Sequence, residues 1–102
     1  MELSTRTLLT IIAEGALEDT LLGDIETLGA RGYTITDARG KGDHGRRDAS
    51  WAPHANIRIE VLCDAATARA LYTSIYERYN DNYSMIMYVS EVGVLRPKKF
   101  DA

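Results

Sequence analysis

The pattern of hydrophobic residues is similar in the two halves of the chain, and the first half predicts a strand, a helix and a second strand. The segment from Thr7 to Ala13 is almost continuously apolar, as buried strands are. Leucine and isoleucine then recur at helical spacing over residues 17–28, and Gly29 follows where such a helix would end. The segment Tyr33–Ala38 predicts the second strand.

The second half begins with a strict alternation of apolar and polar side chains over Ile57–Val61, which predicts a third strand. Asp64 stands where the N-cap of a helix belongs, and an apolar stripe at helical spacing continues to Tyr79. The fourth predicted strand covers Met85–Val92. Regular structure is expected to end at Pro97, within a flexible basic tail over residues 96–102.

This order of elements predicts an α+β, ferredoxin-like βαββαβ fold, in which a four-stranded antiparallel sheet carries both helices on one face. With 102 residues the chain can form one core, so we expect a single domain over residues 1–102. The first and last strands are apolar on both faces, and the uncovered face would therefore expose a large apolar patch. We expect a closed oligomer, most simply a trimer.

Composition narrows the functional classes. The formal net charge is -3 and the pI is about 5.3, which argues against nucleic acid as a partner. Cys63 is the only cysteine, so no internal disulfide can form, and a reducing cytoplasm fits best. The apolar run near the N-terminus is too short to span a bilayer, so no direct membrane insertion is expected.

The loop between the two halves concentrates positive charge in this acidic chain. Its basic side chains are Arg39, Lys41, His44, Arg46 and Arg47. Glycines at positions 40 and 42 leave neighbouring backbone amides open to an anion, so the segment favours a phosphate or carboxylate site. A solvated hairpin is the simpler alternative, but loops of this length are uncommon in small domains unless they bind something. Trp51 could pack on the base of the loop or anchor a partner.

Other motifs are weaker. Residues 40–45 match G-x-G-x-x-G after a strand, but Pro53 and the lack of an apolar helical stripe leave no helix to hold a dinucleotide. His44, His54 and Cys63 do not have the spacing of a common metal site, so no metal is expected. A nucleophile with a matching base cannot be assembled from the sequence, so no catalytic residues and no enzymatic activity are predicted.

Three segments together resemble the PII signalling superfamily, and more narrowly its PII-like branch associated with bicarbonate uptake and carboxysomes. These segments read GARGYTITDARGKG, ANIRIEVL and YNDNYSMIMYVSEVGVL. The spaced matches are Thr34-x-Thr36-x-x-x-Gly40-Lys41-Gly42, Arg58-Ile59-Glu60-x-Leu62 and Glu91-Val92. The resemblance implies a trimer with adenine nucleotides, ADP or AMP, in the clefts between subunits. It also implies a regulatory T-loop, here about residues 40–55.

The resemblance further implies a set of nucleotide-binding positions. They are Thr34, Gly40, Lys41, Gly42, Arg46, Arg47, Glu60, Leu62, Ser84, Met85, Ile86 and Arg96. Thr34 and Leu62 would lie near the base, while the amides of residues 40–42 and the arginines would lie near the phosphates. Guanidinium groups and free amides suit a diphosphate. Bicarbonate is expected beside them, at Lys41, Gly42 and Arg46.

Two departures from the PII pattern shape the functional hypothesis. The T-loop has no tyrosine, and YNDNYSM replaces the glycine- and lysine-rich B-loop of the nitrogen-signalling members. We therefore expect a sensor of adenylate state and inorganic carbon that acts through a protein target, either a bicarbonate transporter or a carboxysome-linked protein. A small trimeric enzyme acting on an anionic metabolite in the same cleft is the alternative. The sequence leaves the preferred nucleotide open.

Overall fold

The computed structural model describes the backbone of residues 2–42, 45–47 and 56–100, and the side chains of these residues except 41–42, 45–47 and 97. The main elements are β1 (Ser4–Glu14), α1 (Glu18–Thr27), β2 (Thr34–Asp37), β5 (Asn56–Cys63), α2 (Ala65–Tyr79) and β6 (Met85–Val94). Short 3-10 helices, η1 (Gly15–Leu17) and η2 (Pro97–Phe100), precede α1 and follow β6.

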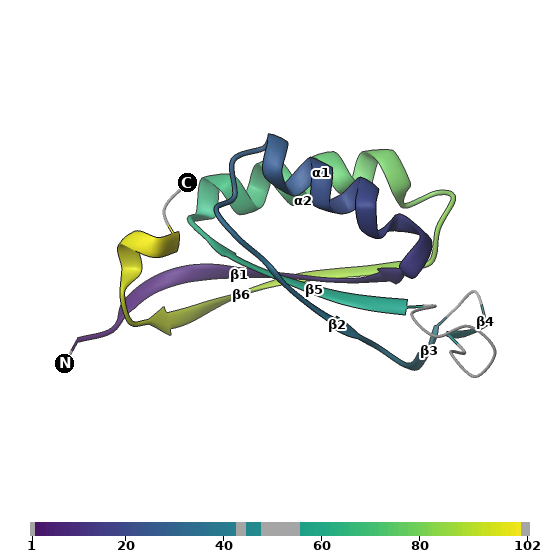
Figure 1. Cartoon of the computed structure of the whole chain (residues 1–102), viewed down its shortest axis with the longest axis horizontal. Helices are drawn as coiled ribbons and strands as arrows, with labels where there is room; N and C mark the ends of the chain where they lie inside the picture. Colours follow the sequence, from purple (N-terminus) through teal and green to yellow (C-terminus); the bar gives the residue numbers. More distant parts are fainter. Residues whose placement is uncertain (1, 43–44, 48–55, 101–102) are drawn as a thin grey trace.

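The four long strands form one antiparallel sheet in the order β2-β5-β1-β6, and both helices lie on the same face of it (Figure 1). This arrangement confirms the predicted α+β, ferredoxin-like βαββαβ fold. The alternating register places the odd-numbered residues of β1 and β5 under the helices. The fully buried core includes Leu9, Ile11, Ile57, Ile59, Val61, Leu21, Ile25, Leu71 and Ile75. Burying each such side chain contributes about 1.5 to 3 kcal/mol relative to exposing it.

The end strands are longer than the hydrophobic pattern predicts. Strand β1 starts at Ser4 rather than Thr7, and β6 continues to Val94 rather than Val92. The two strands pair along their whole length, from Ser4 opposite Val94 to Ala13 opposite Met85. Backbone hydrogen bonding between them therefore extends the strands past the apolar stretch that signals them in the sequence.

The helices are fixed by specific polar contacts. The Asp64 carboxylate accepts a hydrogen bond from the backbone N–H of Thr67 at 2.8 Å, which confirms the predicted N-cap of α2. Asp24 of α1 joins the two helices, because it accepts hydrogen bonds from Arg78 at 2.9 Å and from the Tyr79 hydroxyl at 2.7 Å. Burial raises the pKa of Tyr79, and its hydrogen bond to Asp24 raises it further.

The loop and the tail contain short elements of regular structure. Gly40–Gly42 (β3) and Gly45–Arg47 (β4) pair as a two-stranded hairpin. The expectation that regular structure ends at Pro97 is wrong, because Pro97–Phe100 form η2. Backbone pairing between glycine-rich segments, and a turn of 3-10 helix, leave no hydrophobic periodicity for a sequence pattern to detect.

The face of the sheet that the helices leave uncovered carries the even-numbered residues, including Leu8, Ile12, Ile86 and Tyr88. The Ile86 and Tyr88 side chains are 42% and 47% exposed. Strands β1 and β6 are therefore apolar on both faces, as the sequence predicts.

Candidate functional site

A pocket of about 500 Å³ lies on the uncovered face of the sheet, beside the start of β2. Three of the predicted nucleotide-binding residues, Thr34, Glu60 and Leu62, line it together. Thr34 is paired with Glu60 across the β2–β5 ladder, and Leu62 follows on the same face of β5. Apolar walls come from β1 and β6, through Leu8 and Val92. The pocket therefore combines apolar surface with a few polar groups, which suits a nucleobase or ribose.

The charge of Glu60 in this pocket is balanced by its neighbour on the same strand. Arg58 Nη2 lies 3.1 Å from Glu60 Oε2, with both side chains partly exposed. Exposed pairs of this kind contribute little to stability. The Glu60 carboxylate lines the pocket as a hydrogen-bond acceptor.

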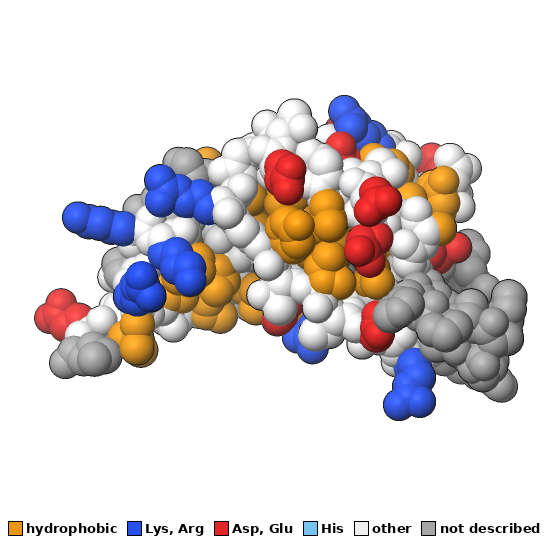
Figure 2. Space-filling view, viewed as in Figure 1, with side chains coloured by type: hydrophobic (Ala, Val, Ile, Leu, Met, Phe, Trp, Pro, Cys, Tyr) orange, Lys and Arg blue, Asp and Glu red, His pale blue; other side chains and the backbone are white. Residues whose placement is uncertain are grey.

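Sequence reasoning missed the other residues of this pocket, among them Arg31 and Tyr33, from the segment before β2, and Lys99 and Phe100, from η2. A cationic hollow of about 510 Å³ lies next to this pocket, at the same end of the molecule. It is lined by Arg31, Arg96, Lys98 and Lys99. Lys and Arg side chains gather around the C-terminal helix at this end (Figure 2). A cluster of basic residues at positions 96–99 was the available signal.

Ser84, Met85 and Ile86 lie at the opposite edge of the sheet from Thr34. The register runs from Ile86 through Ile12 and Arg58 to Thr36, so β6 and β2 are separated by three strand spacings, roughly 14 Å. The backbone N–H of Ser84 donates a hydrogen bond to Glu14 Oε2 at 2.9 Å, which fixes the turn before β6. Within one chain, these residues do not share the pocket of Thr34.

Arg96 is also separated from the predicted phosphate-binding segment. It follows the end of β6, whereas Gly40 continues from the opposite end of β2. Arg96 therefore cannot reach a phosphate held at Gly40 of its own chain. The predicted residues form four groups, at the start of β2, in the β3–β4 hairpin, at the turn before β6 and beyond the end of β6.

The T-loop hairpin brings its predicted anion-binding positions opposite one another. Lys41 pairs with Arg46 and Gly40 pairs with Arg47 along the backbone. Side chains at 41, 46 and 47, together with His44 and Trp51, lie outside the described residues.

The base of this loop is closed by Asn56, which sequence reasoning also missed. The Asn56 carbonyl accepts a hydrogen bond from the backbone N–H of Ala38 at 3.1 Å. Its side chain is 3% exposed, and Nδ2 has no hydrogen-bond partner among the described residues. A buried amide donor without a partner is costly, so it suits a bound acceptor.

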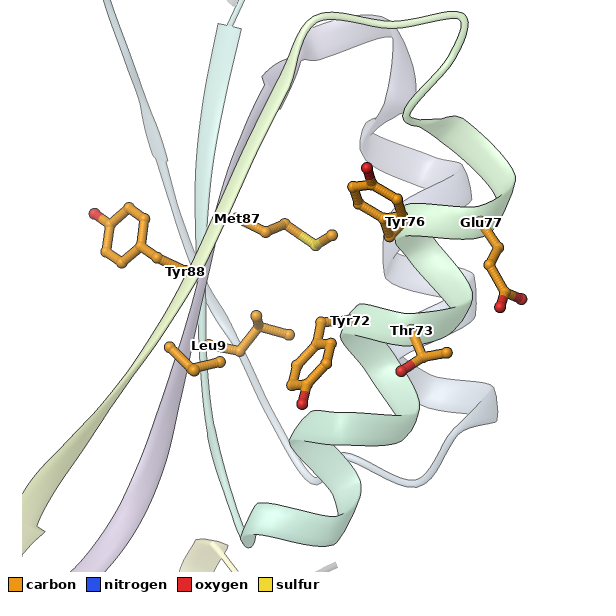
Figure 3. A pocket seen from close by; sticks show the side chains of 8 residues that line it. Leu9, Tyr72, Thr73, Tyr76, Glu77, Met87 and Tyr88 are labelled. Atoms are coloured by element: carbon orange, nitrogen blue, oxygen red, sulfur yellow. The ribbon is translucent and has the colours of Figure 1, made fainter.

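A second, more apolar groove of about 420 Å³ runs between α2 and β6 on the helix-covered side. Tyr72, Tyr76 and Met87 project into it, while Tyr88 points to the other side of the sheet (Figure 3). None of the predicted site residues lines this groove.

Within the described part of the chain, no group of three or more His, Cys, Asp or Glu residues is placed to hold a metal ion. Nor does any described helix have the length and apolar character needed to cross a bilayer. Cys63 is buried, and this burial raises the pKa of its thiol to about 11.

A four-stranded antiparallel sheet with both helices on one face is the fold expected of a protein of the PII type. The sequence profile of the nitrogen regulatory protein P-II family matches residues 6–99, so the chain belongs to this family. The resemblance to the PII superfamily drawn from the sequence is thereby confirmed.

Solved structures give the same result. A PII-like protein from Thermus thermophilus is 38% identical, with a TM-score of 0.83, and the match covers 98% of this chain and 99% of that one. The PII-like protein CPII of Thiomonas intermedia K12, bound to ADP, AMP and bicarbonate, is 27% identical, with a TM-score of 0.90 and 99% and 98% coverage. A Bacillus subtilis GlnK–ATP complex, 12% identical with a TM-score of 0.60 over 94% and 96% of the two chains, shares the fold.

Proposed function

We propose that this PII-like protein senses adenine nucleotides, ADP or AMP, in clefts between the subunits of a trimer, and binds bicarbonate at the base of its T-loop. One observation carries the proposal. Thr34 lies on one edge strand of the sheet, and Ser84–Ile86 lie at the other edge, three strand spacings away in the same chain. A nucleotide bound between two copies would meet one group from each copy. The CPII complexes with the same ligands support the choice of nucleotide and anion.

The uncovered face of the sheet supports the trimer. Its partly exposed apolar side chains, including Ile86 and Tyr88, would be covered by neighbouring copies. In such an assembly Arg96 of one copy could meet phosphates that lie near Gly40 of another, which the single chain does not allow.

Bicarbonate is proposed to bind where residues 40–42 leave the sheet. The Asn56 side chain lies buried at this base and offers an amide donor without a partner among the described residues. Bicarbonate is a small anion that needs several convergent donors, since water competes strongly for it in an open site. Asn56, with Lys41, the Gly42 amide and Arg46, could supply them.

The T-loop is proposed to be the output of the sensor. Nucleotide and bicarbonate would neutralise its cations and favour one loop conformation, which presents or hides a surface for a protein target. We propose that the protein works in the cytoplasm, as a regulator without catalytic activity of its own. Its target would be a bicarbonate transporter or a carboxysome-linked protein.

Calorimetric titration tests the proposal directly. ADP, AMP, ATP and cyclic AMP are titrated with and without bicarbonate, at constant pH and ionic strength. We expect ADP and AMP to bind and bicarbonate to tighten ADP, with the reciprocal effect of ADP on bicarbonate required by linkage. Absence of nucleotide binding would refute the proposed function, whereas ADP binding unaffected by bicarbonate would refute only carbon sensing.

The bicarbonate site has its own variant. Asn56→Asp keeps the shape of the side chain and replaces the amide donor with a negative charge. We expect it to weaken bicarbonate binding at least tenfold, while ADP binding without bicarbonate stays within about twofold. Circular dichroism checks that the variant is folded. An unchanged bicarbonate affinity would remove Asn56 from the site.

A further inference from the structure

The C-terminal helix η2 contributes two side chains to the pocket that holds the predicted base-contacting residues. Lys99 and Phe100 line the same volume of about 500 Å³ as Thr34, Glu60 and Leu62. In the ribbon view η2 folds back from the end of β6 (Figure 1). The helix therefore forms one wall of the pocket.

One hydrogen bond ties this helix to the segment before β2, and a second closes its own turn. Arg31, in the segment before β2, donates from Nη1 to the Lys98 carbonyl at 3.0 Å, and the Lys99 N–H donates to the Arg96 carbonyl at 3.1 Å. The chain enters the helix through Arg96, whose φ of 56° lies in the left-handed region that side chains other than glycine rarely adopt. Such a conformation costs of order 1 to 3 kcal/mol and persists only where surrounding contacts fix it.

The direction of β2 decides which end of a nucleotide η2 would meet. Strand β2 runs from Thr34, at the pocket, to Asp37 and on toward Gly40. Phosphates held by the amides of residues 40–42 would therefore lie on the side of the pocket away from η2. A helix at the Thr34 end faces the base.

We propose that η2 is a recognition element for the nucleobase, an inference that rests on the proposed function. Phe100 is partly buried and offers an aromatic surface for the base. Lys99 offers ammonium donors to the acceptor nitrogens of adenine, since lysine only donates. Arg31 is a positioning residue, because its bond to the Lys98 carbonyl holds both side chains at the pocket.

Adjacent lysines provide a matched test. Lys98 and Lys99 belong to the same helix and are both exposed, but only Lys99 lines the pocket with Thr34. We expect Lys99→Ala to weaken binding about tenfold and Lys98→Ala to change it by less than about twofold. Phe100→Ala should weaken binding by a similar factor to Lys99→Ala. Its control is Leu95→Ala, which removes an apolar side chain that is 49% exposed and does not line the pocket.

The choice of ligands distinguishes base recognition from phosphate recognition. Each variant is titrated with ADP and with adenosine. Because η2 is assigned to the base, the losses caused by Lys99→Ala and Phe100→Ala should be the same for both ligands. A loss seen with ADP but not with adenosine would assign η2 to the phosphates and overturn the inference.

The positioning role of Arg31 needs a measurement that a general loss of stability would not change. Trypsin cuts after Lys98 and Lys99, so the rate of cleavage there, followed by mass spectrometry, reports whether η2 stays docked. Arg31→Ala should speed this cleavage and weaken adenosine binding at an unchanged melting temperature. Arg31→Lys, which keeps a donor, should restore part of both. Unchanged cleavage in Arg31→Ala would refute the positioning role.

The test also separates this inference from the proposed function. If the unaltered protein binds neither ADP nor adenosine, both are wrong. If it binds them and the Lys99 and Phe100 variants behave like their controls, only the role of η2 is wrong.

Discussion

Cys63 ends β5 on the helix-covered face with no exposed surface. Burial, and to a smaller extent the neighbouring Asp64 carboxylate, raises the pKa of its thiol from the ordinary 9.0 to about 11. The thiolate is the reactive form, so this cysteine is chemically inert near neutral pH. A lone cysteine here is a core residue, and it has no place in the proposed sensing mechanism.

The raised pKa predicts how stability depends on alkaline pH. The folded protein holds the thiol proton more tightly than the unfolded chain does, so the stabilisation is fully present below about pH 9 and is lost as the pH rises through about 11. Urea unfolding of the protein and of Cys63→Ala should show a stability difference that shrinks over this window. A difference that does not change with pH would contradict the assignment.

At the scale of elements, the sequence predicts those helices and strands that have a clear side-chain pattern. The period of two over Ile57–Val61 gives β5, and Asp64 gives the start of α2. The hydrophobic pattern gives no signal where backbone pairing or a single helical turn decides, as in the β3–β4 hairpin and in η2. The candidate site divides in the same way, because the motif around Thr34 and Glu60 is local whereas Arg31 and Phe100 meet only after folding.

The N-cap of α2 makes a quantitative prediction. Asp64→Ala removes the acceptor of the Thr67 N–H, and should lower the free energy of unfolding by about 1 kcal/mol. Asp81→Ala, in the exposed turn after α2, is the control and should change stability by less than about 0.5 kcal/mol. Urea midpoints measure both. Equal effects would mean that the cap contributes nothing.

At the scale of the whole molecule, the sheet separates two surfaces with different expected roles. The uncovered face carries Ile86 and Tyr88, while Tyr76 lies on the helix-covered side and lines the groove beside β6. The proposed trimer buries the first surface, so a charge placed there should be tolerated poorly.

Light scattering at micromolar concentration tests this assignment. The unaltered protein should have the mass of a trimer, and Tyr88→Glu should shift it toward the monomer. Tyr76→Glu introduces the same charge at a side chain that is 57% exposed, against 47% for Tyr88, and should leave the trimer intact. A trimer that survives Tyr88→Glu would place the interface elsewhere. A native protein that is already monomeric would exclude the interface.

The position of the predicted binding groups on opposite edges of the sheet has a consequence for mixtures of damaged proteins. If each cleft takes Thr34 and Leu62 from one copy and Ser84–Ile86 from the next, a variant impaired at Leu62 and another impaired at Ser84 fail for complementary reasons. In a trimer that contains both variants, one cleft always combines an intact Leu62 from one copy with an intact Ser84 from its neighbour. Neither variant alone should bind ADP, yet subunits of the two exchanged together should recover one working cleft per mixed trimer, and calorimetry would detect this mutual rescue.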